Sequence, residues 1–286
     1  MSRVQLKRLL KRTPVVSPFL VLGDPTPELS LELAKTAIDA GAGALEIGFP
    51  YGDPVADGPA IQRADMRALS SGTSTSGAMR LLARIHEARP KIPLNLLVYG
   101  NLVHARGFER FTKDAVAAGA SSLLVPDVPL EESATLKRAC RAAGLAHVQL
   151  VGPLTSSERL KRIDRMADGF LYLVAHQGIT GVRAGDFSEV ESLISRTTSV
   201  VRNPVCLGFG LSTFEQIARA FASGARLAVV GSYLANVIGE AWEESGGDRG
   251  ERVVSKFGAA VRELCDGAPR RAPDFRRAGV GPARTR

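Results

Sequence analysis

One signature recurs along the chain: an alanine-rich amphipathic stretch, then a glycine, then a short apolar run. It reads IDAGAGALEIG, AVAAGASSLLVPD, RAAGLAHVQLV, RMADGFLYLVA and AFASGARLAVVGS, with its glycines at Gly41, Gly119, Gly144, Gly169 and Gly224. Their separations of 78, 25, 25 and 55 residues are close to multiples of one repeat of about 26 residues. A glycine that can adopt the left-handed conformation ends a helix, and the apolar run after it indicates a buried strand.

A repeat that alternates helix with strand predicts a parallel sheet. Filling the gaps gives eight strands, at about 16–22, 43–48, 93–99, 121–125, 146–151, 169–174, 204–208 and 226–231. Helices are expected after them, for example at 29–40, 130–143, 187–201 and 213–222, and a short amphipathic helix precedes the first strand. Eight such units favour a single (β/α)8 TIM barrel, an α/β fold, over an open doubly wound sheet. The G-x-G-x-x-G fingerprint of dinucleotide-binding sheets is missing after the first strand.

The net charge of +8 is concentrated at the two ends of the chain. Residues 1–12 carry five basic groups and no acid, and the tail from Ala268 carries six arginines against one aspartate, so the body between them is slightly acidic. We therefore divide the chain into a barrel domain at 1–266 and a disordered Arg/Pro/Gly tail at 267–286. A nucleic-acid role would have to rest on that tail, because binding along a phosphate backbone needs positive charge on the folded body.

The cysteines and the apolar runs indicate in which cellular compartment the protein is found. Cys140, Cys206 and Cys265 are widely spaced without a C-x-x-C pair, which fits a reducing cytoplasm better than a disulfide framework or a zinc site. The histidines show no metal-ligand spacing, and no apolar run is long enough to span a bilayer. We expect a cytoplasmic protein with no metal.

The stretch LEIGFPYGDPVADGP, at 45–59, carries three acids around the end of the second strand. Alternation points Leu45 and Ile47 at the helices and leaves Glu46 facing the barrel axis, where partial desolvation raises a carboxyl pKa toward the operating pH. Asp57, in the loop above, is expected to be more exposed, with a normal pKa; two carboxyls in different environments can divide acid and base work. For Glu46 a structural ion pair is the alternative, and Asp53 taken alone indicates a turn-former.

Small residues gather after the last two strands. G-F-G at 208–210 and Gly231-Ser232 stand at helix starts, where backbone N–H groups and the helix dipole favour phosphate, although loop formation alone also explains them. Ser212 is placed to cap the helix after strand seven.

The glycine-punctuated loop at 175–185 is suited to closing over a ligand. Tyr172 and Tyr99 either face the site or belong to the core.

Together these residues resemble the tryptophan synthase alpha chain family over about 15–240. The matching stretches are PFLVLGDP, ALEIGFPYGDPVADGPAIQRA, LLVYGNLV, LLVPDVPLEES, GITG, GFG and GS. The resemblance implies a carbon–carbon lyase: retro-aldol cleavage of indole-3-glycerol phosphate to indole and D-glyceraldehyde 3-phosphate, in tryptophan biosynthesis. It implies no cofactor on this chain. It also implies a partner, a β subunit that carries pyridoxal phosphate, in an α2β2 heterotetramer.

The resemblance also assigns roles by position. Glu46 and Asp57 match the catalytic pair, Glu46 moving a proton between the indole ring and the side-chain hydroxyl and Asp57 standing beside the indole N–H. Asp53 falls at a position linked to subunit coupling, and Thr180 at the loop threonine that bonds the catalytic aspartate on closure. The phosphate site would comprise Gly181, Gly210, Gly231 and Ser232, and the indole pocket Phe19, Leu97 and Tyr172. The chain departs from the family pattern at Ala175-His176-Gln177 and at Tyr51-Gly52.

Two alternatives use the same barrel. A free-standing indole-releasing lyase would use Glu46 and Asp57 without mutual activation by a β subunit. A catalytically silent barrel that binds a phosphorylated ligand would not need these two acids.

Overall fold

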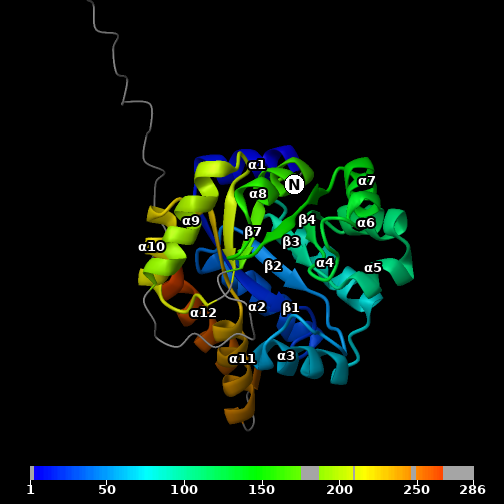
Figure 1. Cartoon of the computed structure of the whole chain (residues 1–286). Helices are drawn as coiled ribbons and strands as arrows, with labels where there is room; N and C mark the ends of the chain where they lie inside the picture. The colour runs from blue at the N-terminus through cyan, green and yellow to red at the C-terminus, as the bar shows by residue number, and fades with distance from the viewer. Residues whose placement is uncertain (1–2, 175–186, 209, 246–248, 267–286) are drawn as a thin grey trace, which may run out of the picture.

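The computed structural model describes residues 3–174, 187–208, 210–245 and 249–266. In these residues the strands form one parallel sheet in the order β5-β4-β3-β2-β1-β9-β8-β7-β6, which curves into a barrel (Figure 1). The strands are β1 Val15–Val21, β2 Leu45–Gly48, β3 Leu94–Leu97, β4 Ala120–Leu124, β5 Ala146–His147, β6 Gln149–Val151, β7 Leu171–Val174, β8 Val205–Gly208 and β9 Leu227–Val230. The predicted α/β barrel is confirmed.

The fifth predicted strand, 146–151, is divided at Val148 into β5 and β6. The first half pairs with β4 and the second with β7. Val148 keeps a backbone hydrogen bond of 3.0 Å to Leu123 O on the β4 side. One segment that changes neighbours in this way brings the two ends of the sheet order together, so the nine strands fill the eight places of the predicted barrel.

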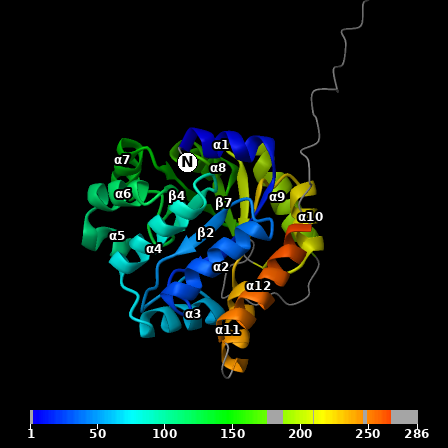
Figure 2. The same ribbon diagram turned by 180° about the vertical axis from the view of Figure 1, so that it is seen from behind.

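Helices surround the sheet on its outer side, as Figures 1 and 2 show from opposite directions. They are α1 Arg3–Arg12, α2 Pro27–Asp39, α3 Pro59–Ser70, α4 Thr75–Ala88, α5 Gly100–Arg106, α6 Phe108–Ala117, α7 Ala134–Ala143, α8 Ser157–Met166, α9 Ser188–Val200, α10 Phe214–Ala222, α11 Ser232–Glu244 and α12 Arg249–Asp266. The four helices named from the sequence are present, with ends that differ by up to four residues. All five glycines of the repeat have positive φ, between 80° and 113°, as their position after a helix predicts.

The strands separate two apolar layers. Leu45 and Ile47 of β2 pack with the helices in the outer layer, whereas Ala44 belongs to the interior cluster that also contains Phe19 and Tyr172. The same alternation along β2 places Glu46 on the inner side, 3% exposed. The barrel axis is therefore filled by side chains, with one carboxyl among them.

Helix α1 closes one end of the barrel. Leu6 and Leu10 are fully buried in the interior cluster. Lys7 Nζ donates to Asn203 Oδ1 at 2.6 Å, and Arg3 forms a 3.5 Å ion pair with Asp168, so polar contacts hold the same helix at its rim. In both views α1 lies at one end of the molecule, and α3 and α11 lie at the other (Figures 1 and 2).

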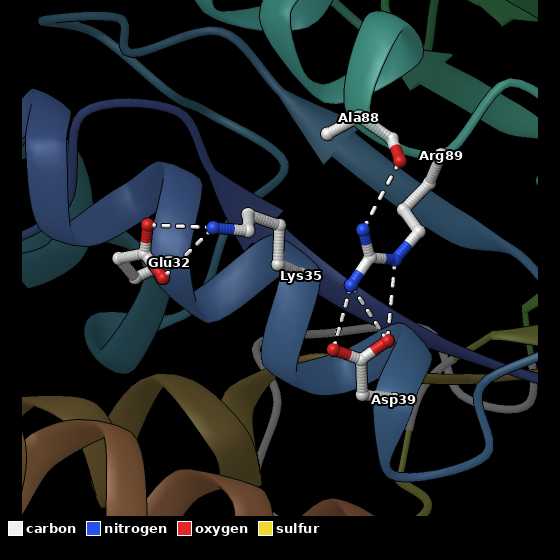
Figure 3. A network of polar contacts seen from close by, with 5 residues as sticks. All are labelled: Glu32, Lys35, Asp39, Ala88 and Arg89. Atoms are coloured by element: carbon white, nitrogen blue, oxygen red, sulfur yellow. Dashed lines mark hydrogen bonds and ion pairs between the residues drawn. The ribbon is translucent and has the colours of Figure 1, made fainter.

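On the outside, a polar network joins α2 to the end of α4 (Figure 3). Arg89, which caps α4, reaches Asp39 at the end of α2 with a shortest contact of 2.7 Å, and Lys35 pairs with Glu32 along α2 at 2.9 Å. Exposed pairs such as Lys35–Glu32 contribute about 0.2–1 kcal/mol each. Arg89 joins two neighbouring helices and Lys35–Glu32 lies within one, but both pairs are outside the barrel interior, so the functional site has to be sought elsewhere.

Candidate functional site

The centre of the site is the buried carboxyl of Glu46. The hydroxyl of Tyr172, from β7, donates to Glu46 Oε2 at 2.9 Å. No described residue donates to the other oxygen, Oε1, which leaves it available to a ligand. The structural ion pair considered for Glu46 is absent from the described residues, so the inward carboxyl has a tyrosine, and not a cation, as its partner.

Burial dominates the acidity of Glu46. The pKa is raised to about 8: burial is the main cause and the nearby charge of Asp57 adds to it, while the hydrogen bond from Tyr172 opposes both by favouring the carboxylate. A carboxyl in this range holds its proton at neutral pH and can also release it. That is the requirement for a group that acts as acid in one step and as base in another.

Asp57 is held by a second tyrosine. Tyr99, two residues after the end of β3, donates its hydroxyl to Asp57 Oδ2 at 2.8 Å and accepts a 3.0 Å bond from the backbone N–H of Ala56. Tyr51 stacks on Tyr99, with ring centroids 5.1 Å apart. Tyr99, which the sequence left open between site and core, is therefore buried and in direct contact with Asp57.

The expectation of a normal pKa for Asp57 is wrong. Asp57 is half-buried and more exposed than Glu46, as expected, but burial still raises its pKa, against the hydrogen bond from Tyr99. The two acids also interact electrostatically, since the charge of Asp57 raises the pKa of Glu46. A ligand that carries positive charge beside Asp57 would favour the ionised form of both.

Asp53 lies on the exposed part of the same loop. Its carbonyl accepts from Val55 N at 3.0 Å, so its backbone takes part in a turn. The side chain makes no hydrogen bond to any described residue, which removes the interpretation of Asp53 as a side-chain turn-former. Val55, beside it, is 77% exposed. The loop thus presents one acid and one apolar side chain to the outside.

The three residues predicted for an apolar pocket share the interior cluster. Phe19 and Tyr172 are buried in it, and Leu97 packs against it partly exposed. Phe19 stands in register with Glu46 across β1 and β2, and Leu97 with Gly48 across β2 and β3. The ring of Phe19 covers Gly48, where a Cβ would lie 2.7 Å from Phe19 Cζ. The ring of Phe19 therefore fills the space over Gly48, two residues from Glu46 on the same strand.

Gly208 has a different role from the one its G-F-G context suggested. A Cβ at this position would lie 2.0 Å from Tyr172 Oη and 2.2 Å from Cζ. Gly208 leaves the space that Tyr172 needs to reach Glu46. The sequence could not show this, because the two residues meet only when β7 and β8 pair.

The small residues predicted for phosphate flank two adjacent strands. Gly210 follows β8 with φ of 79°, and Gly231 precedes Ser232, the first residue of α11. Among the described residues no side chain caps α11, so its first N–H groups keep their capacity for an anion. Ser212 is not the cap of the helix after β8: Thr213 is, through a capping box with Gln216. Gly181, Thr180 and the 175–185 loop lie outside the described residues.

Two further acids near the site were not singled out from the sequence. Asp24 makes a two-bond ion pair with Arg67 of α3, at 2.7 and 2.9 Å. Asp65, also on α3, is 3% exposed and accepts a long 3.4 Å bond from the backbone N–H of Tyr51. On an alanine-rich helix, the sequence pattern around a buried acid is the same as the pattern around a solvent-exposed acid, so the sequence could not identify Asp65 as buried.

Within the described residues there is no group of three or more His, Cys, Asp or Glu side chains arranged to hold a metal ion. A search of the same residues finds no helix both long and apolar enough to cross a membrane.

A protein-family model described as "Tryptophan synthase alpha chain" matches residues 7–266. Among curated proteins, the tryptophan synthase alpha chain of Shewanella oneidensis is 40% identical over 221 residues, covering 77% of this chain and 80% of the relative. That of Methanothermobacter thermautotrophicus is 42% identical over 221 residues, covering 77% and 82%.

Solved structures give the same result. Tryptophan synthase subunit alpha from Legionella pneumophila superposes with a TM-score of 0.82 at 30% identity, covering 93% of this chain and 98% of that one. A chain from a study of mutual activation of the α2β2 tryptophan synthase complex of Pyrococcus furiosus gives 0.81 at 33% identity, covering 89% and 99%.

Proposed function

Because the chain belongs to the tryptophan synthase alpha chain family, we propose that Glu46 and Asp57 carry out that family's reaction here. The protein is the alpha component of tryptophan synthase, a carbon–carbon lyase that cleaves indole-3-glycerol phosphate to indole and D-glyceraldehyde 3-phosphate. The observation that carries the residue assignment is the pair of tyrosine-held carboxyls: Glu46 bound by Tyr172 inside the barrel, and Asp57 bound by Tyr99 at its rim.

The first step needs an acid beside the indole ring. Glu46, protonated at neutral pH because its pKa is about 8, gives its proton to indole C3. The ring becomes a positively charged indolenine whose N–H faces Asp57. The carboxylate of Asp57 stabilises this charge. Asp57 stays in place because Tyr99 holds its other oxygen.

The second step needs a base beside the side-chain hydroxyl. Glu46, now a carboxylate stabilised by Tyr172, takes the proton of the hydroxyl next to the ring. The carbon–carbon bond to C3 breaks, its electron pair restores the aromatic indole, and the hydroxyl carbon becomes the aldehyde of glyceraldehyde 3-phosphate. One proton has moved from oxygen to C3, and Glu46 ends in the protonated state in which it began.

The remaining residues would hold the substrate. Phe19, Leu97 and Tyr172 offer apolar surface to the indole ring, and Gly210, Gly231 and Ser232 offer backbone N–H groups to the phosphate. For Gly181 and Thr180 the proposal rests on the resemblance. The reaction breaks one carbon–carbon bond and moves one proton within the substrate, which asks for no cofactor on this chain, so pyridoxal phosphate is assigned to the β subunit. We place the enzyme in the cytoplasm.

The partner is the tryptophan synthase β subunit, in an α2β2 heterotetramer. We propose that Asp53 contributes to coupling between the subunits, since it is exposed on the loop that also carries Asp57. Asp53→Asn should lower the ratio of lyase rates measured with and without β subunit. The lyase domain is assigned to 1–266; residues 267–286 lie beyond the family match.

The test is indole release from indole-3-glycerol phosphate by wild type, Glu46→Gln and Asp57→Asn, with β subunit present. Each substitution should lower kcat by about 10²–10⁴-fold, because it removes a proton-transfer group or the charge that stabilises the intermediate. Glu158→Gln, at an exposed acid on α8, is the control and should retain the wild-type rate. Equal, measurable rates for all four proteins would overturn the roles of Glu46 and Asp57, and no indole release by wild type even with β subunit would favour the silent barrel.

A further inference from the structure

Asp65 is a buried acid with an incomplete set of partners. It lies on the face of α3 that packs against β1 and α11, among Ala60, Ile61, Ala64 and Ala68. Its Oδ1 accepts from Tyr51 N, whereas the buried Oδ2 has no hydrogen-bond partner among the described residues. A charged carboxylate with one oxygen in this state is costly, and a neutral carboxylic acid is much less so.

The groups that face Asp65 oppose its ionisation. Burial is the main cause that raises the pKa of Asp65 to about 8; the charges of Asp57, on the loop after β2, and Asp24, on the loop after β1, add to it, against the bond from Tyr51 N. The neighbouring cation on α3, Arg67, is engaged by Asp24 with two hydrogen bonds. Tyr99 also lies within electrostatic reach, since Asp65 raises the pKa of its hydroxyl. From α11, Asn236 contacts Arg63 and Gly239 packs on Arg67.

A continuous set of contacts leads from Asp65 to Asp57. Asp65 accepts from the backbone of Tyr51, the ring of Tyr51 stacks on Tyr99, and Tyr99 donates to Asp57. Asn101 Nδ2 donates to Tyr51 Oη at 3.2 Å and fixes the other end of that ring. The backbone bond from Tyr51 to Asp65 therefore anchors the aromatic pair that holds Asp57.

We propose that Asp65 is a positioning residue for Asp57, and that it acts as a neutral carboxylic acid through Tyr51 and Tyr99. This inference rests on the proposed role of Asp57 in the lyase reaction. A neutral acid supplies the acceptor that Tyr51 N–H needs without placing a second negative charge beside Asp57. An ionised Asp65 would instead compete with the charge that Asp57 must carry when the indolenine forms.

Two variants of the full chain, assayed with β subunit, separate the hydrogen-bond acceptor of Asp65 from its lack of charge. Asp65→Asn keeps an acceptor of the same shape and cannot ionise, so it should retain kcat within about threefold at pH 6.5. Asp65→Leu keeps an uncharged side chain of similar size but removes the acceptor, so kcat should fall by about tenfold or more. In an Asp57→Asn background, Asp65→Leu should change kcat by less than about twofold, because its effect passes through Asp57.

A second measurement does not depend on activity. Hydrogen exchange of the 49–58 backbone should be faster in Asp65→Leu than in wild type, and unchanged in Asp65→Asn. In the folded chain Asp65 keeps its proton to about pH 8, whereas in the unfolded chain it loses it near pH 4. Wild type therefore loses stability relative to Asp65→Asn as the pH rises between these values. The Tm of Asp65→Asn should exceed that of wild type by a gap that widens from pH 5 to 8, reaching about 5 °C.

The failures are distinguishable. If wild type and Asp57→Asn release indole equally fast, the proposed role of Asp57 fails. If that pair behaves as expected but Asp65→Asn loses as much activity and loop protection as Asp65→Leu, the neutral positioning role of Asp65 is overturned. A Tm gap between wild type and Asp65→Asn that stays constant with pH would also overturn it.

Discussion

The hydroxyl of Tyr172 donates a 2.9 Å hydrogen bond to Glu46 Oε2 across the barrel interior, although the two residues are 126 positions apart in the chain. β2 and β7 do not pair with each other, so the contact exists only because the sheet closes. It is the one hydrogen bond that the described residues donate to the carboxyl of Glu46, and it favours the carboxylate form. Its removal should therefore be visible in the pH dependence of the reaction.

Tyr172→Phe should move the pH profile upward. In wild type, kcat/KM should fall with a midpoint near pH 8 as free Glu46 loses the proton that it gives to indole C3. Without the donor the carboxylate is less favourable, the pKa rises, and the midpoint should shift by about one pH unit. The rate at pH 7 should fall about tenfold, since the base form is harder to reach.

Indole release measured from pH 5.5 to 9.5 checks this prediction. Tyr233→Phe, at a partly buried tyrosine on α11, serves as the control and should leave the midpoint where it is. A Tyr172→Phe profile that coincides with wild type would show that the hydroxyl does not control Glu46.

Gly208→Ala should break the same Tyr172–Glu46 hydrogen bond by displacing the ring of Tyr172. The added methyl group would lie 2.0 Å from Tyr172 Oη, in a place where the ring has no free space, so Tyr172 has to leave Glu46. We expect a loss of about 1–3 kcal/mol in the free energy of unfolding, together with lowered kcat. Urea unfolding and indole release measure the two effects. Gly250→Ala, where no heavy atom lies within 4 Å of the new Cβ, should change neither.

Leu6→Ala should lower stability. The side chain is fully buried at the end of the barrel that α1 closes, and its truncation leaves a cavity in the interior cluster. The expected cost is about 2–5 kcal/mol in the free energy of unfolding. Val4→Ala, on the same helix but 59% exposed, should cost less than about 0.5 kcal/mol. Similar losses for the two variants would contradict the burial of α1.

Arg67→Met should destabilise the fold by leaving Asp24 buried without its cation. Removal of one partner of such a pair costs about 3–5 kcal/mol, whereas Asp24→Asn combined with Arg67→Met should recover most of the loss. Burial already raises the pKa of Asp24 to about 6 in spite of Arg67. In Arg67→Met it should rise further, so Asp24 takes up its proton at a higher pH than in wild type and the loss should shrink as the pH falls from 8 toward about 6. Urea unfolding at pH 5 and pH 8 tests both statements.

The repeat of helix, glycine and strand predicted the architecture because each unit obeys local rules. Gly41 and its four equivalents have the positive φ that ends a helix, and the alternation along β2 placed Glu46 inside. Local rules of this kind depend on residues within one turn or one strand. They determine which way a side chain points.

Local rules do not determine which distant residues a side chain contacts in the folded chain. The hydrogen bond of Tyr99 to Asp57, the space that Gly208 leaves for Tyr172 and the raised pKa of Asp57 depend on strands brought together by closure of the barrel. The burial of Asp65 was missed for the same reason. An acid on an amphipathic helix is usually solvated, and only the packing of α3 against β1 makes it otherwise.

Closure of the barrel by α1 also determines the route of the product. Leu6 and Leu10 fill the end of the barrel at the beginning of the strands, so indole formed at the proposed site beside Glu46 would leave past the opposite rim. That rim carries the 49–58 loop, with Val55 turned outward. A β subunit bound over this rim would receive the indole as it leaves.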